Sequence, residues 1–171
     1  PIGIAGSYHP IDFNFQESSS TSTTYTAEVI HSAPPGFTLP ASLDGVSTIR
    51  YYTISKSSGS SFTNGIVSLI YSSEDGVTDD ADLRIAKSNG TVWQDLGPAA
   101  GGSAGQILST TAFSSLADNI FVLANTFGGG NPLPVELSSF SASVKNGAVV
   151  LNWRTKTEVQ NYGFELERTS A

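Results

Sequence analysis

The sequence predicts an all-β protein built as a β-sandwich. Short runs rich in β-branched and aromatic residues recur between turn signals, and no run with helical periodicity stands out. Only 13% of the residues are charged, against roughly 25% in an average soluble domain, and the chain contains 17 glycines. This composition is typical of an extracellular β-protein whose many strands are joined by Gly- and Ser-rich turns.

The strand-like runs follow one another at the short, regular spacing expected of a sandwich. In the first run Ile11, Phe13 and Phe15 share one face, as the two-residue period of a strand requires. Residues 49–54 carry bulky side chains on both faces, which indicates a central strand. The expected strands cover residues 11–15, 25–31, 46–55, 65–72, 82–88, 91–96, 106–113 and 119–125.

A Gly- and Pro-rich stretch, FGGGNPLP at residues 127–134, predicts a linker. Its glycines permit flexibility, and its prolines force an extended entry into the next strand. We therefore expect a β-sandwich domain over residues 1–126 and a separate segment over residues 135–171. The earlier stretch LGPAAGGSAG is expected to be a loop inside the first domain, because no Gly-Lys-Ser/Thr follows it as a phosphate-binding loop would require.

Two Asn-Gly dipeptides each lie between strand-like runs, and this is the strongest short-range signal for a β-hairpin. A two-residue loop at Asn89-Gly90 predicts a cross-strand ion pair between Arg84 and Asp95. The other pairs predicted for this hairpin are Ser88 with Thr91, Ala86 with Trp93, and Leu83 with Leu96.

A two-residue loop at Asn146-Gly147 predicts a second hairpin, whose two faces differ in polarity. The polar face carries Ser141, Ser143 and Asn152, and the other face forms an apolar stripe that ends in two aromatic rings. The clean separation of the two faces supports this register. The predicted pairs are Lys145 with Ala148, Val144 with Val149, Ala142 with Leu151, and Phe140 with Trp153.

The tail, PLPVELSSFSASVKNGAVVLNWRTKTEVQNYGFELER at residues 132–168, resembles the start of an immunoglobulin- or fibronectin-III-like module. Such modules recur near the C-termini of large surface proteins that Gram-negative bacteria export by the type IX secretion pathway. The resemblance rests on the Pro-Val-Glu-Leu run at residues 134–137 and on a set of later positions, namely Phe140, Leu151, Trp153, Glu158, Asn161, Gly163, Phe164, Glu165, Glu167 and Arg168.

The body of the chain resembles a β-sandwich module found upstream of that tail in the same proteins, through IRYYTI, VSLIYSSEDGVTDDADLRIAKSNGTVWQDLG and FVLAN. The resemblance implies a jelly-roll or immunoglobulin-like sandwich located outside the cell or on its surface. It also implies a role as a stalk, spacer or adhesive building block without enzymatic activity. Only about three strands follow Pro134, whereas a fibronectin-like sandwich has about seven.

A segment of three strands would leave the face formed by Phe140, Leu151 and Trp153 bare, and an exposed apolar face with open edges promotes aggregation. Three explanations stay open: a longer protein, folding of the tail onto the first domain, or completion of a neighbouring subunit by strand donation. The third predicts a homo-oligomer or polymer. Its expected interface residues are Phe140, Leu151, Trp153, Phe164 and, in the strand-compatible stretch PIGIAG, Ile2 and Ile4.

Charge and composition exclude several other classes of function. The net charge of −7 and pI of about 4.6 disfavour nucleic acid and anionic membrane surfaces, because both require clustered Lys and Arg. Without cysteine the chain has neither disulfides nor thiolate metal sites. It contains no apolar run of about 20 residues, so membrane insertion is not expected.

An acidic run between two expected strands is the one candidate metal site, for a structural calcium ion held by Glu74, Asp75, Asp79, Asp80 and Asp82. Its spacing does not match an EF-hand, and a solvated loop is the simpler interpretation. The only histidines, His9 and His31, lie near prolines outside any catalytic motif, and no Gly-x-Ser-x-Gly elbow occurs.

The function expected from these observations is that of a secreted structural subunit, not an enzyme, in an extracellular assembly or filament. The alternative is a carbohydrate-binding or adhesive module of a larger secreted protein. A glycan platform would use exposed rings, although aromatic side chains on alternating strands are more often part of a core. The aromatics considered for that platform are Tyr8, Tyr51, Tyr52, Tyr71 and Trp93.

Overall fold

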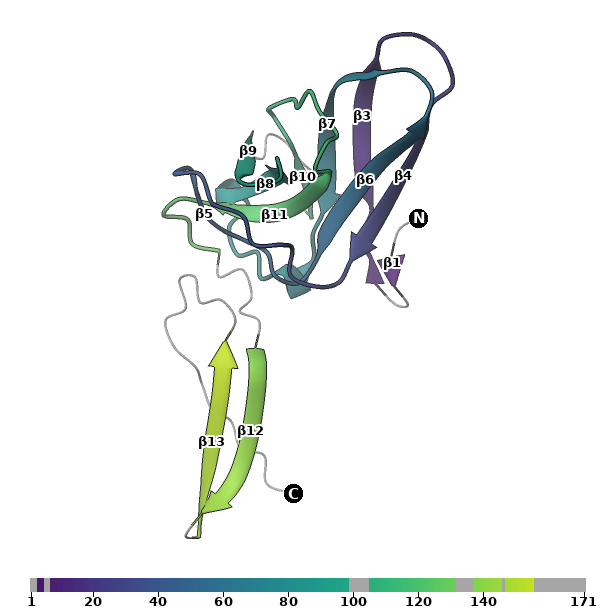
Figure 1. The fold of residues 1–171 in the computed structure, drawn as a ribbon. Coiled ribbons are helices and arrows are strands. Elements are labelled where there is room, and N and C mark those ends of the chain that lie inside the picture. Colours follow the sequence, from purple (N-terminus) through teal and green to yellow (C-terminus); the bar gives the residue numbers. More distant parts are fainter. Residues whose placement is uncertain (1–2, 5–6, 99–104, 132–136, 146, 156–171) are drawn as a thin grey trace. The chain divides into compact units, whose positions relative to one another are not determined.

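A computed structural model describes the chain except for residues 1–2, 5–6, 99–104, 132–136, 146 and 156–171 (Figure 1). The fold is all-β, with several antiparallel sheets arranged as a β-sandwich, as the sequence predicts. Packing divides the chain into two compact units, residues Pro1–Pro134 and Val135–Ala171. Each unit is described by itself.

The strands of the first unit are short, and two single-turn 3-10 helices, η1 at Ser73–Asp75 and η2 at Asp80–Asp82, follow β7. The predicted strand over residues 46–55 is two strands, because Arg50 and its neighbours leave the sheet between them. The strands are β1 Gly3–Ile4, β2 Ser7–Tyr8, β3 Ile11–Glu17, β4 Thr24–Ile30, β5 Leu43–Val46, β6 Tyr51–Ser58, β7 Phe62–Ile70, β8 Leu83–Ser88, β9 Trp93–Pro98, β10 Gln106–Leu108 and β11 Ile120–Thr126.

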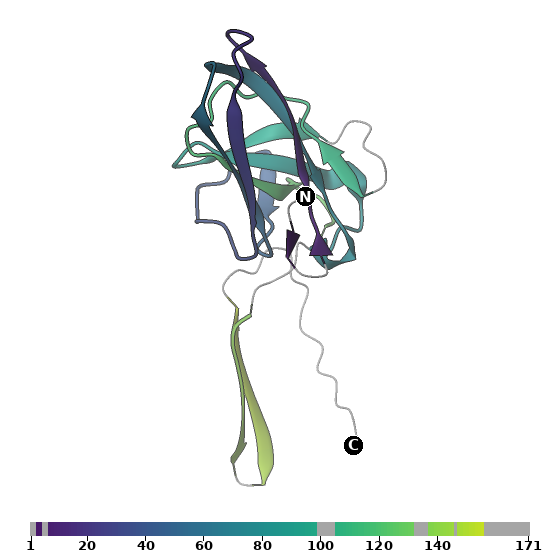
Figure 2. The same cartoon turned by 90° about the vertical axis from the view of Figure 1, so that its right-hand side faces the viewer.

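Two sheets form the sandwich. The smaller has the order β10-β7-β3, and the larger has the order β4-β6-β11-β8-β9, with β5 also paired to β11. Figures 1 and 2 show the two sheets stacked, with β3 and β4 at the same end of the stack. The connection between these two strands therefore carries the chain from one sheet to the other.

The main core lies between the two sheets. Side chains at alternate positions of each strand point into it, as expected for strands with one buried face. Phe121 on β11 is fully buried there, and its ring centroid lies 5.2 Å from that of Phe113. The core consists of Ile11, Tyr52, Ile54, Val67, Leu69, Leu83, Ile85, Leu96, Ile107, Phe113, Phe121 and Leu123.

A second core covers the opposite face of the larger sheet. Trp93 lies at its centre, edge-on to the ring of Phe37 at 5.2 Å, and it is buried together with Leu43, Ala86, Val122 and Ala124. Strand β11 contributes to both cores, Phe121 and Leu123 to the first and Val122 and Ala124 to the second. This explains why its sequence is a continuous apolar run instead of an alternating one.

The register predicted for the hairpin at Asn89-Gly90 is wrong. The structure pairs Ser88 with Trp93 and Ala86 with Asp95, so the loop has four residues. The side chain of Asn89 accepts hydrogen bonds from the backbone N–H groups of Thr91 (3.2 Å) and Val92 (3.0 Å), which widens the turn. The predicted ion pair is wrong too: Arg84 donates to the carbonyl of Ala81 at 2.7 Å instead.

The predicted linker begins later than expected, because residues 127–131 pack on the first unit. Asn131 is buried, and its side chain forms hydrogen bonds with backbone groups of the loop after η1. Its side-chain oxygen accepts from the N–H groups of Thr78 and Asp79, both at 2.8 Å. Its amide donates to the carbonyl of Asp79 at 2.8 Å and to Asn125 at 3.1 Å. The buried Asn131 thus fixes residues of the first unit by hydrogen bonds, at a position where composition alone suggested a flexible chain.

Replacing Asn131 with alanine is expected to lower the free energy of unfolding of the first unit by about 1–3 kcal/mol, because the N–H groups of Thr78 and Asp79 lose the acceptor that the buried Asn131 supplies. Urea unfolding followed by Trp93 fluorescence, in a Trp153→Phe background, measures this loss. Asn14→Ala, at an exposed strand position, is the control and is expected to change stability by less than about 0.5 kcal/mol. Equal effects of the two variants would contradict the assigned role of Asn131.

The described residues of the second unit form a hairpin of β12 at Leu137–Lys145 and β13 at Ala148–Thr155. Its register is the predicted one, with Phe140 opposite Trp153 and Lys145 opposite Ala148. The turn residue Gly147 has a φ of 78°, which glycine adopts without strain. The third strand expected in this segment falls outside the described residues.

Candidate functional site

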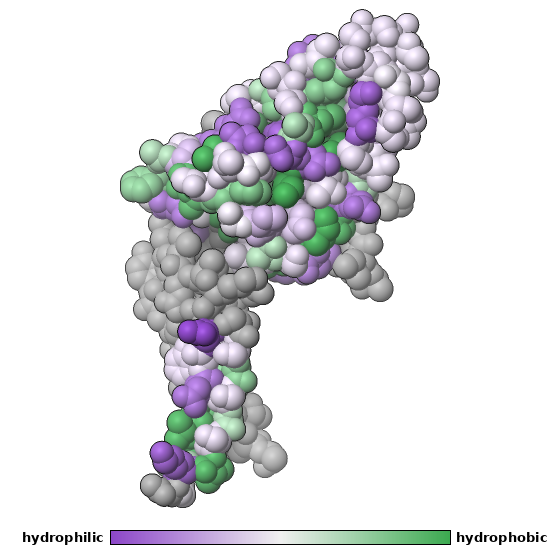
Figure 3. Space-filling model, in the orientation of Figure 1, coloured by the Kyte–Doolittle hydropathy of each residue, from purple (hydrophilic) through white to green (hydrophobic). Residues whose placement is uncertain are grey.

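The apolar face of the β12–β13 hairpin is the most exposed hydrophobic surface in the second unit. Val144 is 77% exposed, Val149 68%, Phe140 59% and Trp153 39%. Figure 3 shows hydrophobic residues in green along this hairpin. All four side chains belong to the same face, because they form two directly opposed pairs that lie four residues, an even number, apart along each strand.

A two-stranded hairpin alone is marginally stable in water and needs packing on one face to persist. Between the Phe140–Trp153 pair and the Val144–Val149 pair the hairpin places Ala142 opposite Leu151, so the stripe is continuous over three cross-strand pairs. Contiguous exposed apolar surface of this kind is found at interaction sites and on aggregation-prone surfaces. The arrangement is suited to association through packing and strand pairing.

In the first unit, β3 and β4 are the outermost strands of their sheets. Among the described residues, β3 pairs with β7 alone and β4 pairs with β6 alone. Each strand is seven residues long, so each presents a row of backbone donors and acceptors along its outer side. Such edges are templates for an added strand.

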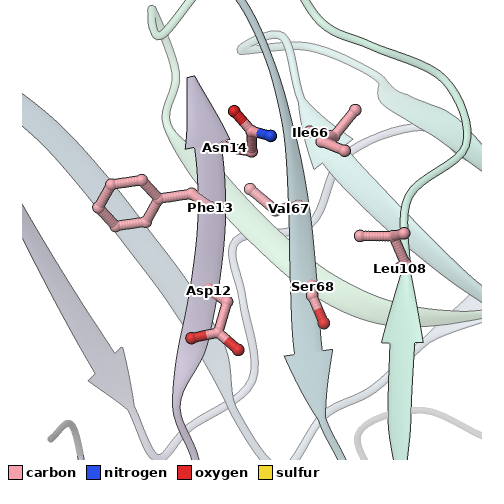
Figure 4. Close-up of a pocket in the computed structure, with 7 residues that line it drawn as sticks. All are labelled: Asp12, Phe13, Asn14, Ile66, Val67, Ser68 and Leu108. Atoms are coloured by element: carbon pink, nitrogen blue, oxygen red, sulfur yellow. The ribbon is translucent and has the colours of Figure 1, made fainter. Parts of the chain in front are cut away.

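Aromatic rings link these two edges. The ring of Phe13 stacks on that of Phe15 at 4.5 Å and lies 5.8 Å from that of Tyr25 on β4. Phe15 meets Tyr25 edge-on at 5.0 Å, and the hydroxyl of Tyr25 donates to Glu17 at 2.8 Å. Phe13 is 41% exposed and extends from β3 on the side away from β7 (Figure 4). The open end of the sandwich is therefore apolar.

A shallow hollow lies on the outer face of the smaller sheet and is drawn in Figure 4. Its polar groups come from Asp12, Asn14 and Ser68, and its apolar lining includes Ile66 and Leu108. Its volume of about 160 Å³ is below the roughly 300–1,000 Å³ typical of small-molecule sites. We therefore do not assign a ligand to it.

A buried cluster of charged side chains lies at the other end of β3. Arg50 is 1% exposed and donates through Nη1 to Glu74 at 2.9 Å and through Nη2 to the fully buried Asp75. The backbone N–H of Ser72 also donates to Asp75, at 2.7 Å. His9 Nε2 contacts the same oxygen of Glu74 that Arg50 binds. The cluster connects three segments of the chain. They are His9 (two residues before β3), Arg50 (directly before β6) and η1, which contains Glu74 and Asp75.

Burial governs the proton affinities in this cluster. Burial, and next the positive charge of Arg50, lower the pKa of His9. Burial raises the pKa of Asp75, against the opposing effects of the Ser72 N–H and of Arg50. The N–H of Ser72 and the guanidinium of Arg50 together make a buried carboxylate at Asp75 tolerable.

The structure does not bring the five predicted calcium ligands together. Glu74 and Asp75 bind Arg50, Asp79 accepts from the N–H of Ala81 at 2.9 Å, and Asp82 accepts from the N–H of Gly130 at 2.8 Å. Asp80 lies in η2 and hydrogen-bonds Tyr71. Within the described part of the chain, no three His, Asp or Glu residues gather as a metal site.

The rings considered for a glycan platform do not form one. Tyr52 is fully buried and Trp93 is 2% exposed, so both belong to the cores. Tyr8 is exposed, on β2. The sequence pattern already favoured this outcome, because Tyr52 and Trp93 lie on predicted strands, where aromatic side chains more often belong to a core.

Two of the six predicted interface residues, Ile2 and Phe164, lie outside the described residues. Ile4 lies on β1, which pairs with β2 through Ile4 and Ser7. Phe140, Leu151 and Trp153 share one hairpin face, as expected from the spacing. Sequence inspection missed the edges of β3 and β4, because which strands are outermost depends on long-range pairing.

No protein-family model, curated protein or solved structure matches this chain. The resemblance to surface proteins of the type IX pathway therefore stays a prediction. In the described residues, no helix has the length and apolarity needed to cross a membrane.

Proposed function

We propose that this chain is a structural subunit of an extracellular assembly and associates with further copies of itself through β-strand pairing. The observation that carries the proposal is the exposed apolar face of the β12–β13 hairpin, with Phe140 and Val144 more than half exposed. A second copy that packs on this face removes the rings and the valines from water.

The magnitude of this effect favours association. Burying a single Val or Phe side chain contributes about 1.5–3 kcal/mol, and the hairpin offers several such side chains side by side. Association also costs translational and rotational freedom, so an extended contact that includes backbone hydrogen bonds is needed. The open edges of β3 and β4 supply backbone groups for such a contact.

The extracellular location is supported by composition. Few charges and many Gly- and Ser-rich turns are typical of an extracellular β-protein. The tail's resemblance to modules of exported surface proteins points the same way. Immunogold labelling of thin sections of producing cells with antibodies to the first unit tests this location, and label confined to the cell interior would contradict it.

The purified chain is expected to self-associate, with an average mass that rises with concentration in multi-angle light scattering. The double substitution Phe140→Ser with Val144→Ser is expected to shift the distribution to monomers, because it removes two side chains from the apolar face. Ser141→Thr with Ser143→Thr, on the opposite face of the same strand, is the matched control and is expected to behave as the wild type.

A wild-type chain that stays monomeric up to its solubility limit would refute the assembly proposal. In that case a glycan array would test the adhesive alternative directly. Equal loss of association in both double variants would indicate that the hairpin had unfolded, and circular dichroism of each variant separates this outcome from loss of the interface.

A further inference from the structure

We propose that β13 of one copy pairs antiparallel with β3 of the next copy, with Trp153 opposite Phe13 and Leu151 opposite Phe15. This inference rests on the proposed function and assigns its donor strand, its acceptor edge and its register. The partner is thus a second copy of this chain, and each copy uses a different strand for each neighbour.

The backbone N–H and C=O groups of Phe13 and Phe15 point to the outer edge of β3, where they can form hydrogen bonds with an added strand. Gly65 and Phe113 exchange backbone hydrogen bonds of 2.9 and 3.0 Å, so Gly65 directs its groups away from β3. Ser109 likewise donates to the carbonyl of Val67 at 2.8 Å. Their partners across the ladder are Phe15 and Phe13, which therefore direct their own N–H and C=O groups away from β7.

On β13, the backbone groups of Leu151 and Trp153 likewise point to the outer edge, so they can pair with those of Phe15 and Phe13. Lys145 and Ala148 close a two-residue loop, and such a closing pair exchanges its backbone hydrogen bonds across the hairpin. Hydrogen-bonded and non-hydrogen-bonded pairs then alternate along the ladder. The alternation makes Leu151 and Trp153 members of non-hydrogen-bonded pairs, so their backbone groups point away from β12.

The side chains agree with this backbone phase. Phe13 and Phe15 share one face of β3, and Leu151 and Trp153 share the apolar face of the hairpin. Directly opposed residues in an antiparallel pair project to the same face. The proposed pairing thus places Trp153 beside the exposed ring of Phe13 and continues the apolar surface from one copy to the next.

Several registers bring the outward-pointing backbone groups of β3 and β13 face to face, and charge selects one of them. With Trp153 opposite Phe13, Arg154 lies opposite Asp12 and Asn152 opposite Asn14. A shift of two residues in either direction removes the opposition between Arg154 and Asp12. The wider pattern agrees, since the charged residues of β12 and β13 are Lys145 and Arg154, whereas those of β3 and β4 are Asp12, Glu17 and Glu28.

A rival register uses β12 as the donor and places Lys145 opposite Asp12. It opposes Val144 to Phe13 and Ala142 to Phe15, whereas the β13 register opposes Trp153 and Leu151 to the same rings. The β13 register buries the larger apolar side chains, and apolar area dominates the free energy of such contacts. We therefore assign β13 as the donor and test the two registers against each other.

A charge exchange tests the assignment. Asp12→Lys and Arg154→Glu are each expected to weaken self-association about tenfold, because each replaces an attraction by a repulsion. A mixture of the two variants is expected to regain association to within about threefold of the wild type, since every contact in an alternating mixture joins opposite charges. The control variant Lys145→Glu is expected to associate like the wild type on its own, because residue 145 does not oppose Asp12 in the β13 register.

Engineered disulfides test the register directly, because the chain contains no cysteine. Asn14 and Asn152 form a directly opposed, non-hydrogen-bonded pair in the proposed ladder, where Cα atoms lie about 4.5 Å apart and a disulfide can form. Mixing full-length Asn14→Cys and Asn152→Cys chains of different mass is expected to give the mixed dimer on mild oxidation. Asn14→Cys with Ser143→Cys, the pair that the β12 register opposes, is the control.

Rescue by the mixture of Asp12→Lys with Arg154→Glu and cross-linking of residues 14 and 152 would support the proposal. Weak association of Lys145→Glu alone, or preferential cross-linking of residues 14 and 143, would overturn it in favour of β12. If the wild type associates but none of the charge variants weakens it and neither pair cross-links, the assigned edge is wrong while the assembly proposal stands. A monomeric wild type would refute both.

Discussion

Replacing Arg50 with alanine is expected to lower the free energy of unfolding of the first unit by about 3–5 kcal/mol, a large share of a typical domain's stability. The substitution leaves the fully buried carboxylate of Asp75 without its cation. Glu74, which is 47% exposed in its side chain, turns to water at little cost, so Asp75 accounts for most of the loss.

Urea unfolding at several pH values measures this loss and gives a second diagnostic. Burial already raises the pKa of Asp75, and removal of Arg50 raises it further. A raised carboxyl pKa means that the folded state binds a proton more tightly than the unfolded state, so stability decreases as pH rises through that pKa. The deficit of Arg50→Ala should therefore shrink as the pH is lowered.

Two further variants separate the charge effect from lost packing. Arg50→Met combined with Asp75→Leu removes both buried charges and is expected to recover most of the stability, because an apolar pair carries no desolvation penalty. Glu28→Ala, at an exposed position of β4, is the acidic control. A double variant as unstable as Arg50→Ala alone would show that the buried ion pair is not the cause.

Replacing Phe121 with alanine is expected to cost about 3–5 kcal/mol, because it leaves a cavity in the main core. The ring is fully buried, contacts that of Phe113 at 5.2 Å, and lies under the ammonium group of Lys87 at 5.8 Å. Burial lowers the pKa of Lys87, whose ammonium group also donates to the carbonyls of Ser88 and Ala117 at 2.9 and 3.0 Å.

Denaturant unfolding of Phe121→Ala, with Trp93 fluorescence as the reporter, measures the cost. Phe127→Ala removes the same side chain just beyond the end of β11, where the ring is 71% exposed, and is the matched control. We expect the control to stay within about 0.5 kcal/mol of the wild type. A loss below 1 kcal/mol for Phe121→Ala would mean that the core collapses around the gap.

Features that depend on local chemistry could be predicted from the sequence. The register of the β12–β13 hairpin follows from Asn146-Gly147 and the separation of its faces, so Phe140 and Trp153 are correctly opposed. At Asn89-Gly90 the same signal fails, because the Asn89 side chain holds Thr91 and Val92 in a wider turn. The backbone of Thr38 donates to the carbonyl of Thr91 and accepts from the N–H of Trp93, a contact that no local pattern encodes.

Long-range pairing explains the other differences between prediction and structure. Glu74 and Asp75 look like cation ligands within their own loop, but Arg50, more than 20 residues earlier, supplies the positive charge. Asn131 sits in a Gly- and Pro-rich stretch that locally indicates a linker, yet its amide satisfies a loop around Thr78. The acceptor edge of β3 likewise becomes visible only when the strand order of the sheets is known.

The position of β11 between two cores has a consequence for the tolerance of the chain to mutation. A strand with one buried face accepts polar replacements at every second residue, whereas Phe121, Val122, Leu123 and Ala124 are all enclosed. Substitutions in this strand are therefore limited to apolar residues of similar volume on both of its faces. The five-residue stretch FVLAN should thus be the slowest-changing part of the first unit, while the exposed positions of β4 remain free to vary.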